Sequence, residues 1–444
     1  MAEFDSYSFI IGASLVVILS YFFNIIAKKT NIPSVLMLLL LGILITAGLS
    51  FLGYPRINLK PALEVLGIIG LIMIVLEAAL DLELKRNKWP IIWKAFTLAL
   101  VSLGISAVVI AGIISFYIDT SLQKALLYAI PLSIMSSAII IPSVVNFRAD
   151  LREFMIYEST FSDILGIMFF YFTMESFHYE QAAVFTRSIL GNVLLTIFTS
   201  VTISILLILI FQRIRTQVKL FLFLSVLFVL YSVGKLLHLS SLLIILIFGL
   251  MLENREQIFR RFLNRFINET VLGQIIANFK LITLESSFII RTFFFVIFGM
   301  SLTLSSLLNW KVFLISILIV MVLYAIRYLF LWLIIRKDFS NLLFLIPRGL
   351  ITILLFYAIP SEYKSAAFDS GILLFTILFT SIAMSVSLIR NRQKPIGEEP
   401  ADTIRVVDVH GRLIPEELFS PTKAIEAEGD GVQSENTDPD KPDT

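Results

Sequence analysis

Two carboxylates, Glu158 and Asp163, lie inside one long apolar stretch that contains the segment YESTFSDILG. A charged side chain at the centre of a bilayer costs at least about 2.5 to 3.5 kcal/mol, so each of them needs a partner or a function. Five residues of helix correspond to roughly 500° of rotation and about 7.5 Å of rise, so the two side chains face different neighbours. We therefore expect separate roles for them.

Two arginines in equally apolar surroundings are the expected partners of Glu158. Arg327 lies in VLYAIRYLFLWL and Arg348 in IPRGL. A guanidinium stays charged and offers two parallel hydrogen bonds, which suits it to a permanent pair. The pattern predicts a structural salt bridge that involves Glu158, Arg327 and Arg348.

Asp163 is then left without an obligatory counter-ion. A carboxylate removed from water can be neutralised by a proton or by a bound cation, and these alternatives exclude each other. That competition is the basis of an ion exchanger. The hydroxyl groups of Ser159, Thr160 and Ser162 could complete an oxygen shell, so we predict that Asp163 and these residues bind a proton or a metal ion, Na⁺ or K⁺.

Composition places most of the chain in lipid. Hydrophobic residues make up 58% of the sequence, charged residues only 15%, and the mean hydropathy is +0.91, whereas about a quarter of the residues of a soluble domain are charged. The apolar runs have the length of about 20 residues that a helix needs to cross a membrane. They are apolar all round rather than alternating, which favours helices over a barrel. The predicted fold class is an all-α polytopic membrane protein.

Chemistry of other classes finds little support. The chain has no cysteine, which excludes disulfides, thiolate metal sites and cysteine nucleophiles. It has no HExxH motif and no plausible Ser/His pair in the apolar runs, so we do not expect a membrane-embedded hydrolase or another enzyme. We expect no cofactor and no nucleic acid partner. The expected partners are membrane lipid, monovalent cations and protons.

The apolar runs predict thirteen spans. Basic residues such as Lys28, Lys85, Arg86, Arg213 and Arg336 all fall in alternate loops, which the positive-inside rule makes cytoplasmic. The N-terminus is then outside and the C-terminus inside. We expect a transmembrane domain over residues 1–390 and a mostly disordered, acidic cytoplasmic tail over residues 391–444. The spans lie near 6–27, 32–52, 63–82, 91–118, 124–145, 153–176, 186–212, 218–235, 239–252, 287–307, 311–335, 341–360 and 367–389.

A weak internal symmetry relates spans 1–6 to spans 8–13. The fifth and twelfth spans contain Pro142 and Pro347, which remove the helical hydrogen bonds to the carbonyls of Ala138 and Leu343. Paired interruptions in corresponding spans of two halves indicate the binding site of a transporter. Glu77 falls toward the cytoplasmic end of the third span, where we expect a solvated rim.

The sequence resembles the monovalent cation/proton antiporter superfamily, in particular its sodium/proton exchanger, NhaP-like branch, over residues 6–390. The resemblance implies two inverted six-helix repeats with crossed broken helices, alternating access of an elevator kind, a homodimer, and a cell membrane location, here a bacterial inner membrane. It places the ion-binding carboxylate at Asp163, the salt-bridged glutamate at Glu158, and the core arginines at Arg327 and Arg348. It assigns the broken helices to Ser136, Ser137, Pro142, Pro347 and Gly349. The matching segments are IPSVLMLLLLGILI, LGIIGLIMIVLEAALDL, ESTFSDILGI, RTFFFVIFGMSL, AIRYLF and PRGLITILL.

Two departures from the family pattern bear on function. Ser162 replaces the usual Asn before the aspartate, which leaves one carboxylate and favours electroneutral exchange. Ile140 and Ile141 replace the Thr-Asp of a Thr-Asp-Pro motif, and the residues before them resemble the potassium-efflux branch. The first hypothesis is therefore exchange of Na⁺ or K⁺ for H⁺. The alternative is a non-transporting or channel-like membrane sensor on the same scaffold.

Overall fold

The computed structural model describes most of the apolar part of the chain, and every regular element in these residues is a helix. The all-α prediction is confirmed. The predicted acidic tail lies outside the described residues. The structure describes residues 6–30, 32–53, 59–144, 147–178, 182–211, 219–236, 241–255, 257, 269–301, 309–335, 340–365 and 367–390.

Long apolar helices dominate the described residues. Eight of them are long and apolar enough to cross a membrane, and three further apolar helices are shorter. The chain is thus a multi-pass membrane protein. Its α-helices are α1 (Ser6–Thr30), α2 (Ser34–Phe51), α3 (Lys60–Asp81), α4 (Trp89–Ile118), α5 (Leu122–Ser133), α6 (Ser137–Ser143), α7 (Ala149–Glu175), α8 (Ala182–Phe211), α9 (Lys219–Leu236), α10 (Ser241–Glu253), α12 (Glu269–Ser301), α13 (Trp310–Ile334), α14 (Ser340–Leu343), α15 (Leu350–Ala358) and α16 (Gly371–Arg390).

Two of the predicted spans are each divided into two helices. The fifth span is α5 followed by α6, and the twelfth is α14 followed by α15. Counted as single spans, these pairs reduce the fifteen described α-helices to the thirteen segments that hydropathy predicts. A helix interrupted inside a membrane exposes backbone groups that need partners other than water.

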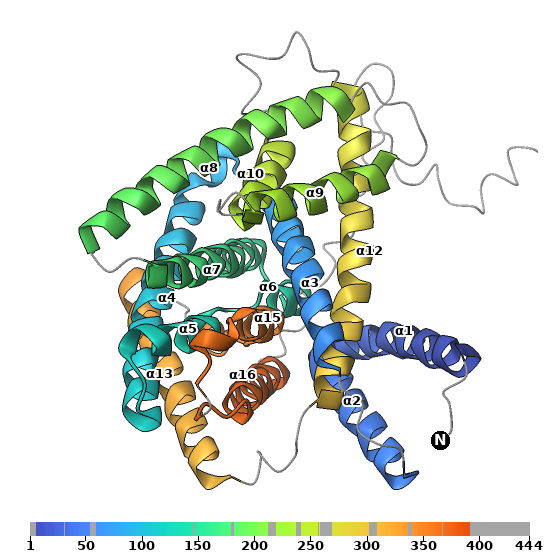
Figure 1. Cartoon of the computed structure of the whole chain (residues 1–444), viewed down its shortest axis with the longest axis vertical. Helices are drawn as coiled ribbons and strands as arrows, with labels where there is room; N and C mark the ends of the chain where they lie inside the picture. The colour runs from blue at the N-terminus through green and yellow to red at the C-terminus, as the bar shows by residue number, and fades with distance from the viewer. Residues whose placement is uncertain are drawn as a thin grey trace, which may run out of the picture. The chain divides into compact units, whose positions relative to one another are not determined.

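The helices pack in two groups; in Figure 1, α4, α5 and α13 lie to the left of α15, and α1, α2 and α12 lie to its right. The first group contains α1, α2, α3, α10 and α12, with contacts of α12 to α2 and α3, and of α10 to α3 and α9. The second contains α4, α5, α7, α13 and α16, with contacts of α4 to α5, α7 and α13. Contacts of α3 with α15 and α7 join the two groups.

The packing repeats itself along the chain. The pairs α1·α2 and α4·α7 have counterparts seven spans further on in α9·α10 and α13·α16. The pair α2·α12 has its counterpart in α10·α3, where α10 is seven spans after α2 and α3 is seven spans before α12. Since seven is odd, two equivalent spans cross the membrane in opposite directions. This pattern is that of two inverted repeats, and it puts the interrupted fifth and twelfth spans in equivalent positions.

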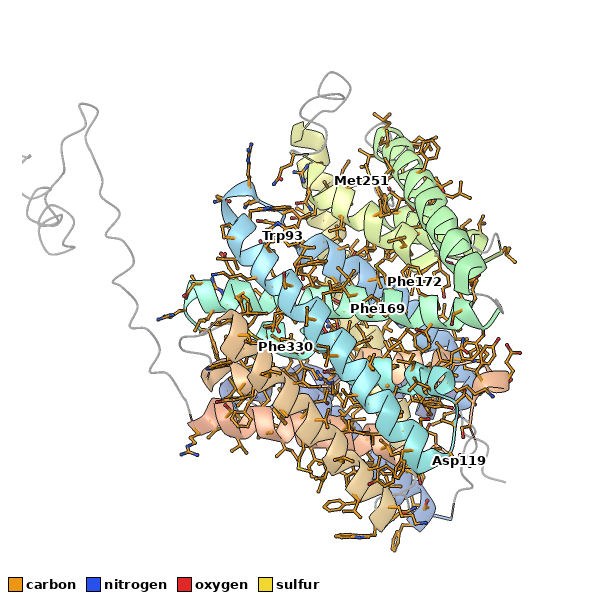
Figure 2. The ribbon with its side chains drawn as sticks, turned by 90° about the vertical axis from the view of Figure 1, so that its left-hand side faces the viewer. Trp93, Asp119, Phe169, Phe172, Met251 and Phe330 are labelled. Carbon is orange, nitrogen blue, oxygen red and sulfur yellow. The ribbon has the colours of Figure 1, made fainter. Side chains whose placement is uncertain are left out.

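The second group is organised around α4. Figure 2 shows this helix running across α7, from Trp93 near its start to Asp119 just after its end, with Phe169 of α7 close to the crossing. The helix stops because Asp119 adopts a left-handed conformation, with φ of 50°, and aspartate tolerates that conformation better than most residues do. Its buried face is mostly apolar and combines alanines such as Ala95 and Ala99 with larger side chains such as Leu98 and Leu103.

The first group contains a close backbone crossing. A Cβ atom added to Gly42 of α2 would overlap the carbonyl oxygen of Val296 of α12, and one added to Gly299 of α12 would overlap the carbonyl oxygen of Leu39 of α2. Thr46 adds a hydrogen bond to the carbonyl of Met300, 3.1 Å long. Small residues that let two backbones approach are a common basis of helix association in lipid.

This crossing predicts a position-specific effect of adding one methyl group. Gly42→Ala should destabilise the protein by about 1 to 3 kcal/mol, the usual cost of overpacking, because the obstructing atoms belong to backbone. Gly48→Ala on the same helix is the matched control, since nothing lies within 4 Å of its added Cβ. The measurement is the apparent melting temperature in detergent. Equal midpoints for the two variants would contradict the crossing.

Candidate ion-binding site

The two helix interruptions meet in the interior. Residues 134–136 separate α5 from α6, and residues 344–349 separate α14 from α15. The backbone N–H of Ser136 donates to the carbonyl oxygen of Pro347 over 3.0 Å, so the breaks touch directly. Gly349 permits this approach, because a Cβ there would lie 2.6 Å from Oγ of Ser136.

Of the positions assigned to the first break from the sequence, Ser136 lies in it, whereas Pro142 does not, which corrects that part of the expectation. Pro142 is inside α6, whereas the backbone becomes extended at Ile134 (ψ 133°) and Ser136 (ψ 110°). The helix is interrupted at this point because residues from other segments bind its backbone N–H groups, and not because of a local residue preference. Ser137 begins α6, and Pro347 and Gly349 do lie in the second break.

Three consecutive N–H groups of the first break have partners from other segments. Met135 donates to Oγ of Ser162 over 2.9 Å, Ser136 to Pro347, and Ser137 to Oδ2 of Asp163 over 3.1 Å. An orphaned backbone donor in an apolar interior costs about 1 to 3 kcal/mol. These three bonds therefore hold the break against α7 on one side and against the second break on the other.

Asp163 lies at the crossing and keeps one oxygen unused. Its residue exposure is 1%. Oδ2 accepts the bond from Ser137, whereas Oδ1 has no hydrogen-bond partner among the described residues. No guanidinium or ammonium group in the described part of the chain forms an ion pair with it. The carboxylate therefore has room in its coordination for one more ligand.

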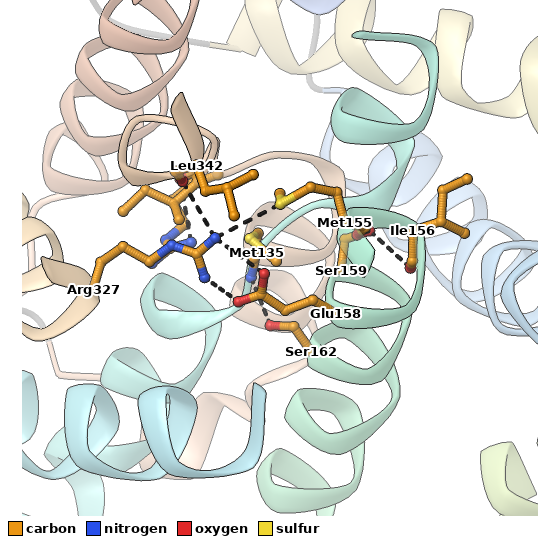
Figure 3. Close-up of polar contacts among 10 residues, drawn as sticks. Met135, Met155, Ile156, Glu158, Ser159, Ser162, Arg327 and Leu342 are labelled. Atoms are coloured by element: carbon orange, nitrogen blue, oxygen red, sulfur yellow. Dashed lines mark hydrogen bonds and ion pairs between the residues drawn. The ribbon is translucent and has the colours of Figure 1, made fainter. Parts of the chain in front are cut away.

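The three predicted hydroxyl ligands differ in their surroundings. Ser162 is buried and accepts the bond from Met135, and Ser159 donates to the carbonyl of Met155 over 2.7 Å (Figure 3). Thr160 is fully buried and its Oγ1 has no partner within the described residues. Both serine oxygens retain a lone pair, because an oxygen of this type can accept two hydrogen bonds.

Glu158 and Arg327 form a two-point ion pair in the interior, which Figure 3 shows with its neighbours. Nη1 of Arg327 bonds to Oε1 of Glu158, and Nη2 to Oε2 over 3.0 Å. Nη2 also donates to the carbonyl oxygen of Leu342 over 3.3 Å, in the last turn of α14. The guanidinium therefore neutralises the carboxylate of Glu158 and also donates a hydrogen bond to a carbonyl group of the interrupted helix.

Arg348 has different partners from those expected. Its Nε donates to the carbonyl of Leu132 over 2.7 Å and its Nη1 to the carbonyl of Ile346 over 3.3 Å, and among the described residues it forms no ion pair with Glu158. Its backbone N–H donates to Oγ1 of Thr380 over 3.0 Å. Leu132 lies at the C-terminal end of α5, where the partial negative charge of a helix dipole attracts a cation.

A polar cavity lies beside the ion pair. Asp163 is absent from its lining, so the two carboxylates of α7 face different spaces, as their spacing predicts. The lining residues are Ala99, Ser102, Leu103, Ser133, Met135, Glu158, Ser162, Leu323, Arg327, Ile346 and Arg348.

Reasoning from the sequence missed Glu77. Its side chain is only 16% exposed and pairs with Arg291 of α12, with Oε1 and Nη2 3.3 Å apart. The position of this carboxylate at the end of an apolar run indicates a solvated rim. The sequence does not indicate its pairing with Arg291, because that arginine is 214 residues away.

The buried pair gives a test of the electrostatics. Glu158→Gln should destabilise the protein by about 3 to 5 kcal/mol, because it leaves the charge of Arg327 uncompensated in the interior. The double variant Glu158→Gln/Arg327→Gln should recover much of that loss. Glu83→Gln is the control, since Glu83 and Lys85 form an exposed pair of a kind worth about 0 to 1 kcal/mol. Apparent melting temperatures in detergent check this order, and a double variant less stable than Glu158→Gln would contradict it.

Comparisons with known proteins agree with this architecture. A comparison with curated protein sequences gave no match. Two structures of the sodium proton antiporter MjNhaP1 from Methanocaldococcus jannaschii share the fold. The structure at pH 8 has 21% sequence identity, covers 86% of this chain and 94% of that chain, and gives a TM-score of 0.61. The electron microscopy structure has 20% sequence identity, covers 87% of this chain and 95% of that chain, and gives a TM-score of 0.63.

The family model of the transmembrane sodium/hydrogen exchanger matches residues 14–390. The chain therefore belongs to the sodium/hydrogen exchanger family.

Proposed function

We propose that this protein exchanges a monovalent cation, Na⁺ or K⁺, for H⁺ across the membrane, one for one, at Asp163. The observation that carries the proposal is the position of this carboxylate. It is buried at the crossing of two interrupted helices, one of its oxygens has no partner among the described residues, and no fixed cation neutralises it.

The charges around the crossing support electroneutral exchange. Glu158 and Arg327 cancel each other, so the charge that changes is on Asp163. A proton and a monovalent cation each add one positive charge to that carboxylate. The loaded site then has the same charge in both halves of the cycle, and exchange of one for one moves no net charge.

The ligand set supports a hard monovalent cation. Oδ1 of Asp163 and the hydroxyl oxygens of Ser159 and Thr160, four and three residues before it on α7, are oxygen donors, the type that alkali cations prefer. In α6, the side chain of Ile140 is fully buried and Ile141 follows it. That helix therefore contributes no second carboxylate, which fits a single exchangeable charge. The choice between Na⁺ and K⁺ is part of the experiment below.

The division of the helices into two groups supports alternating access. The crossed breaks and Asp163 belong to the group around α4, and contacts of α3 with α15 and α7 border that group. We propose that movement across this border exposes Asp163 to each side in turn. We further propose a homodimer, with the N-terminus outside and the C-terminus in the cytoplasm. The exposed apolar face of α1, which includes Tyr7, Phe9 and Leu15, is available for lipid or for a second copy.

Exchange through Asp163 is tested by reconstitution into vesicles that contain a pH dye. Addition of Na⁺ or K⁺ outside should drive the cation into the lumen and protons out, so the lumen should become more alkaline. Asp163→Asn should abolish this response because its amide cannot exchange a proton. Asp150→Asn is the matched control on the same helix, since Asp150 is exposed and pairs only with the neighbouring Arg148 among the described contacts.

Three details of the assay separate the alternatives. Each alkali cation is added in turn, which defines selectivity. Clamping the membrane potential should leave the rate unchanged if exchange is electroneutral. A wild-type protein that moves no protons with any cation would reject exchange and favour the sensor, and a current that persists without a proton gradient would indicate a channel.

A further inference from the structure

Gly166 lies one turn after Asp163 on α7, where the described structure leaves no room for a side chain. A Cβ atom at this position would overlap Cγ1 and Cδ1 of Ile134, whereas Cβ of Ile134 lies 3.4 Å away, which is ordinary contact. Ile134 is 1% exposed and is the first residue of the break between α5 and α6. Its side chain therefore occupies the space that the missing side chain of Gly166 leaves.

The contact of Ile134 with Gly166 is the apolar part of the contact between the break and α7. The hydrogen bonds at the exchange site are its polar part. The three residues after Ile134 donate their N–H groups in order to Ser162, to Pro347 and to Asp163. Gly166 lies four residues after Ser162 and three residues after Asp163, so on the face of α7 toward the break it neighbours each of them. Ile134 seated on Gly166 thus sets how closely the break approaches this face, and with it the N–H of Ser137 that binds the carboxylate.

We propose that Gly166 is a positioning residue of the exchange site, which holds the break at the distance that the bond from Ser137 to Asp163 requires. This inference rests on the proposed function. A methyl group on Gly166 has to displace Cγ1 and Cδ1 of Ile134, and because Ile134 is itself buried, we expect this displacement to move the break. Displacement of a ligating group by about 1 Å can change a rate by roughly 10²-fold.

The test uses the same vesicle assay on the full chain, with the cation concentration for half-maximal exchange and the pH profile as readouts. Gly166→Ala should raise that concentration by about tenfold or more and shift the pH profile. Gly104→Ala on α4 is the control, because nothing lies within 4 Å of its added Cβ. It should match wild type in both readouts.

A compensating pair of variants makes the test specific. Ile134→Ala removes the two carbons that the new methyl would overlap, so Ile134→Ala/Gly166→Ala should return both readouts to within about threefold of wild type. Ile134→Val/Gly166→Ala keeps a Cγ1 atom and should stay impaired. If Gly166→Ala alone does not reach the membrane, the comparison of the two double variants still tests the proposal. Ile134→Ala/Gly166→Ala should then fold and exchange, whereas Ile134→Val/Gly166→Ala should not.

Several results would overturn the proposal. They are wild-type exchange by Gly166→Ala, equal rescue by alanine and valine, or a loss of melting temperature with unchanged cation dependence and pH profile. Failure of the proposed function looks different, because wild type and Asp163→Asn would then be equally inactive. In that event the melting temperatures of the same variants still report on the contact, and additive effects of Ile134→Ala and Gly166→Ala would reject it.

Discussion

Interrupting a helix inside a membrane frees backbone N–H and C=O groups that water cannot reach, and the arrangement of the core follows from the need to satisfy them. The two breaks partly satisfy each other through Ser136 and Pro347. The remaining free backbone groups have different partners according to whether they are donors or acceptors. Free N–H groups of the first break are bound by Ser162 and Asp163 of α7, and free carbonyls near both breaks are bound by Arg327 and Arg348.

This division explains why the two arginines are not equivalent. Arg327 reaches the carbonyl of Leu342 in α14 while its charge is balanced by Glu158. Arg348 reaches the carbonyl of Leu132 at the end of α5 and forms no ion pair with a carboxylate in the described structure. Its positive charge is therefore stabilised by the carbonyl groups of Leu132 and Ile346 and by the C-terminal end of α5.

Prediction from the sequence succeeded where the cause is local or follows from charge. Apolar runs identify the helices, because lipid requires a length and an all-round hydrophobic surface that the sequence displays directly. The pairing of Glu158 with Arg327 follows from the cost of leaving either one alone in an apolar interior. The thirteen segments and the equivalent positions of the two interrupted spans could be predicted for the same reasons.

Prediction failed where distant residues decide the outcome. The first break precedes Pro142 because Ser162, Pro347 and Asp163 take over the N–H groups of residues 135–137, and no local preference announces that. Arg348 was assigned a carboxylate because a sequence shows charges but not which carbonyls a fold leaves free. Glycine at 166 is likewise uninformative until Ile134 is seen to lie against it.

The spacing of Glu158 and Asp163 has a consequence for exchange. A carboxylate that paired with a guanidinium would be neutralised permanently, and a monovalent cation would have to displace a stronger partner. Glu158 turns Arg327 toward a different face of α7 and holds it with two bonds. Asp163 meets instead a backbone N–H, which has no charge to compete with a cation and no proton to lose near neutral pH. The structural carboxylate thus keeps the arginine away from the exchangeable one, and a span with either carboxylate alone would be a poorer exchanger than a span with both.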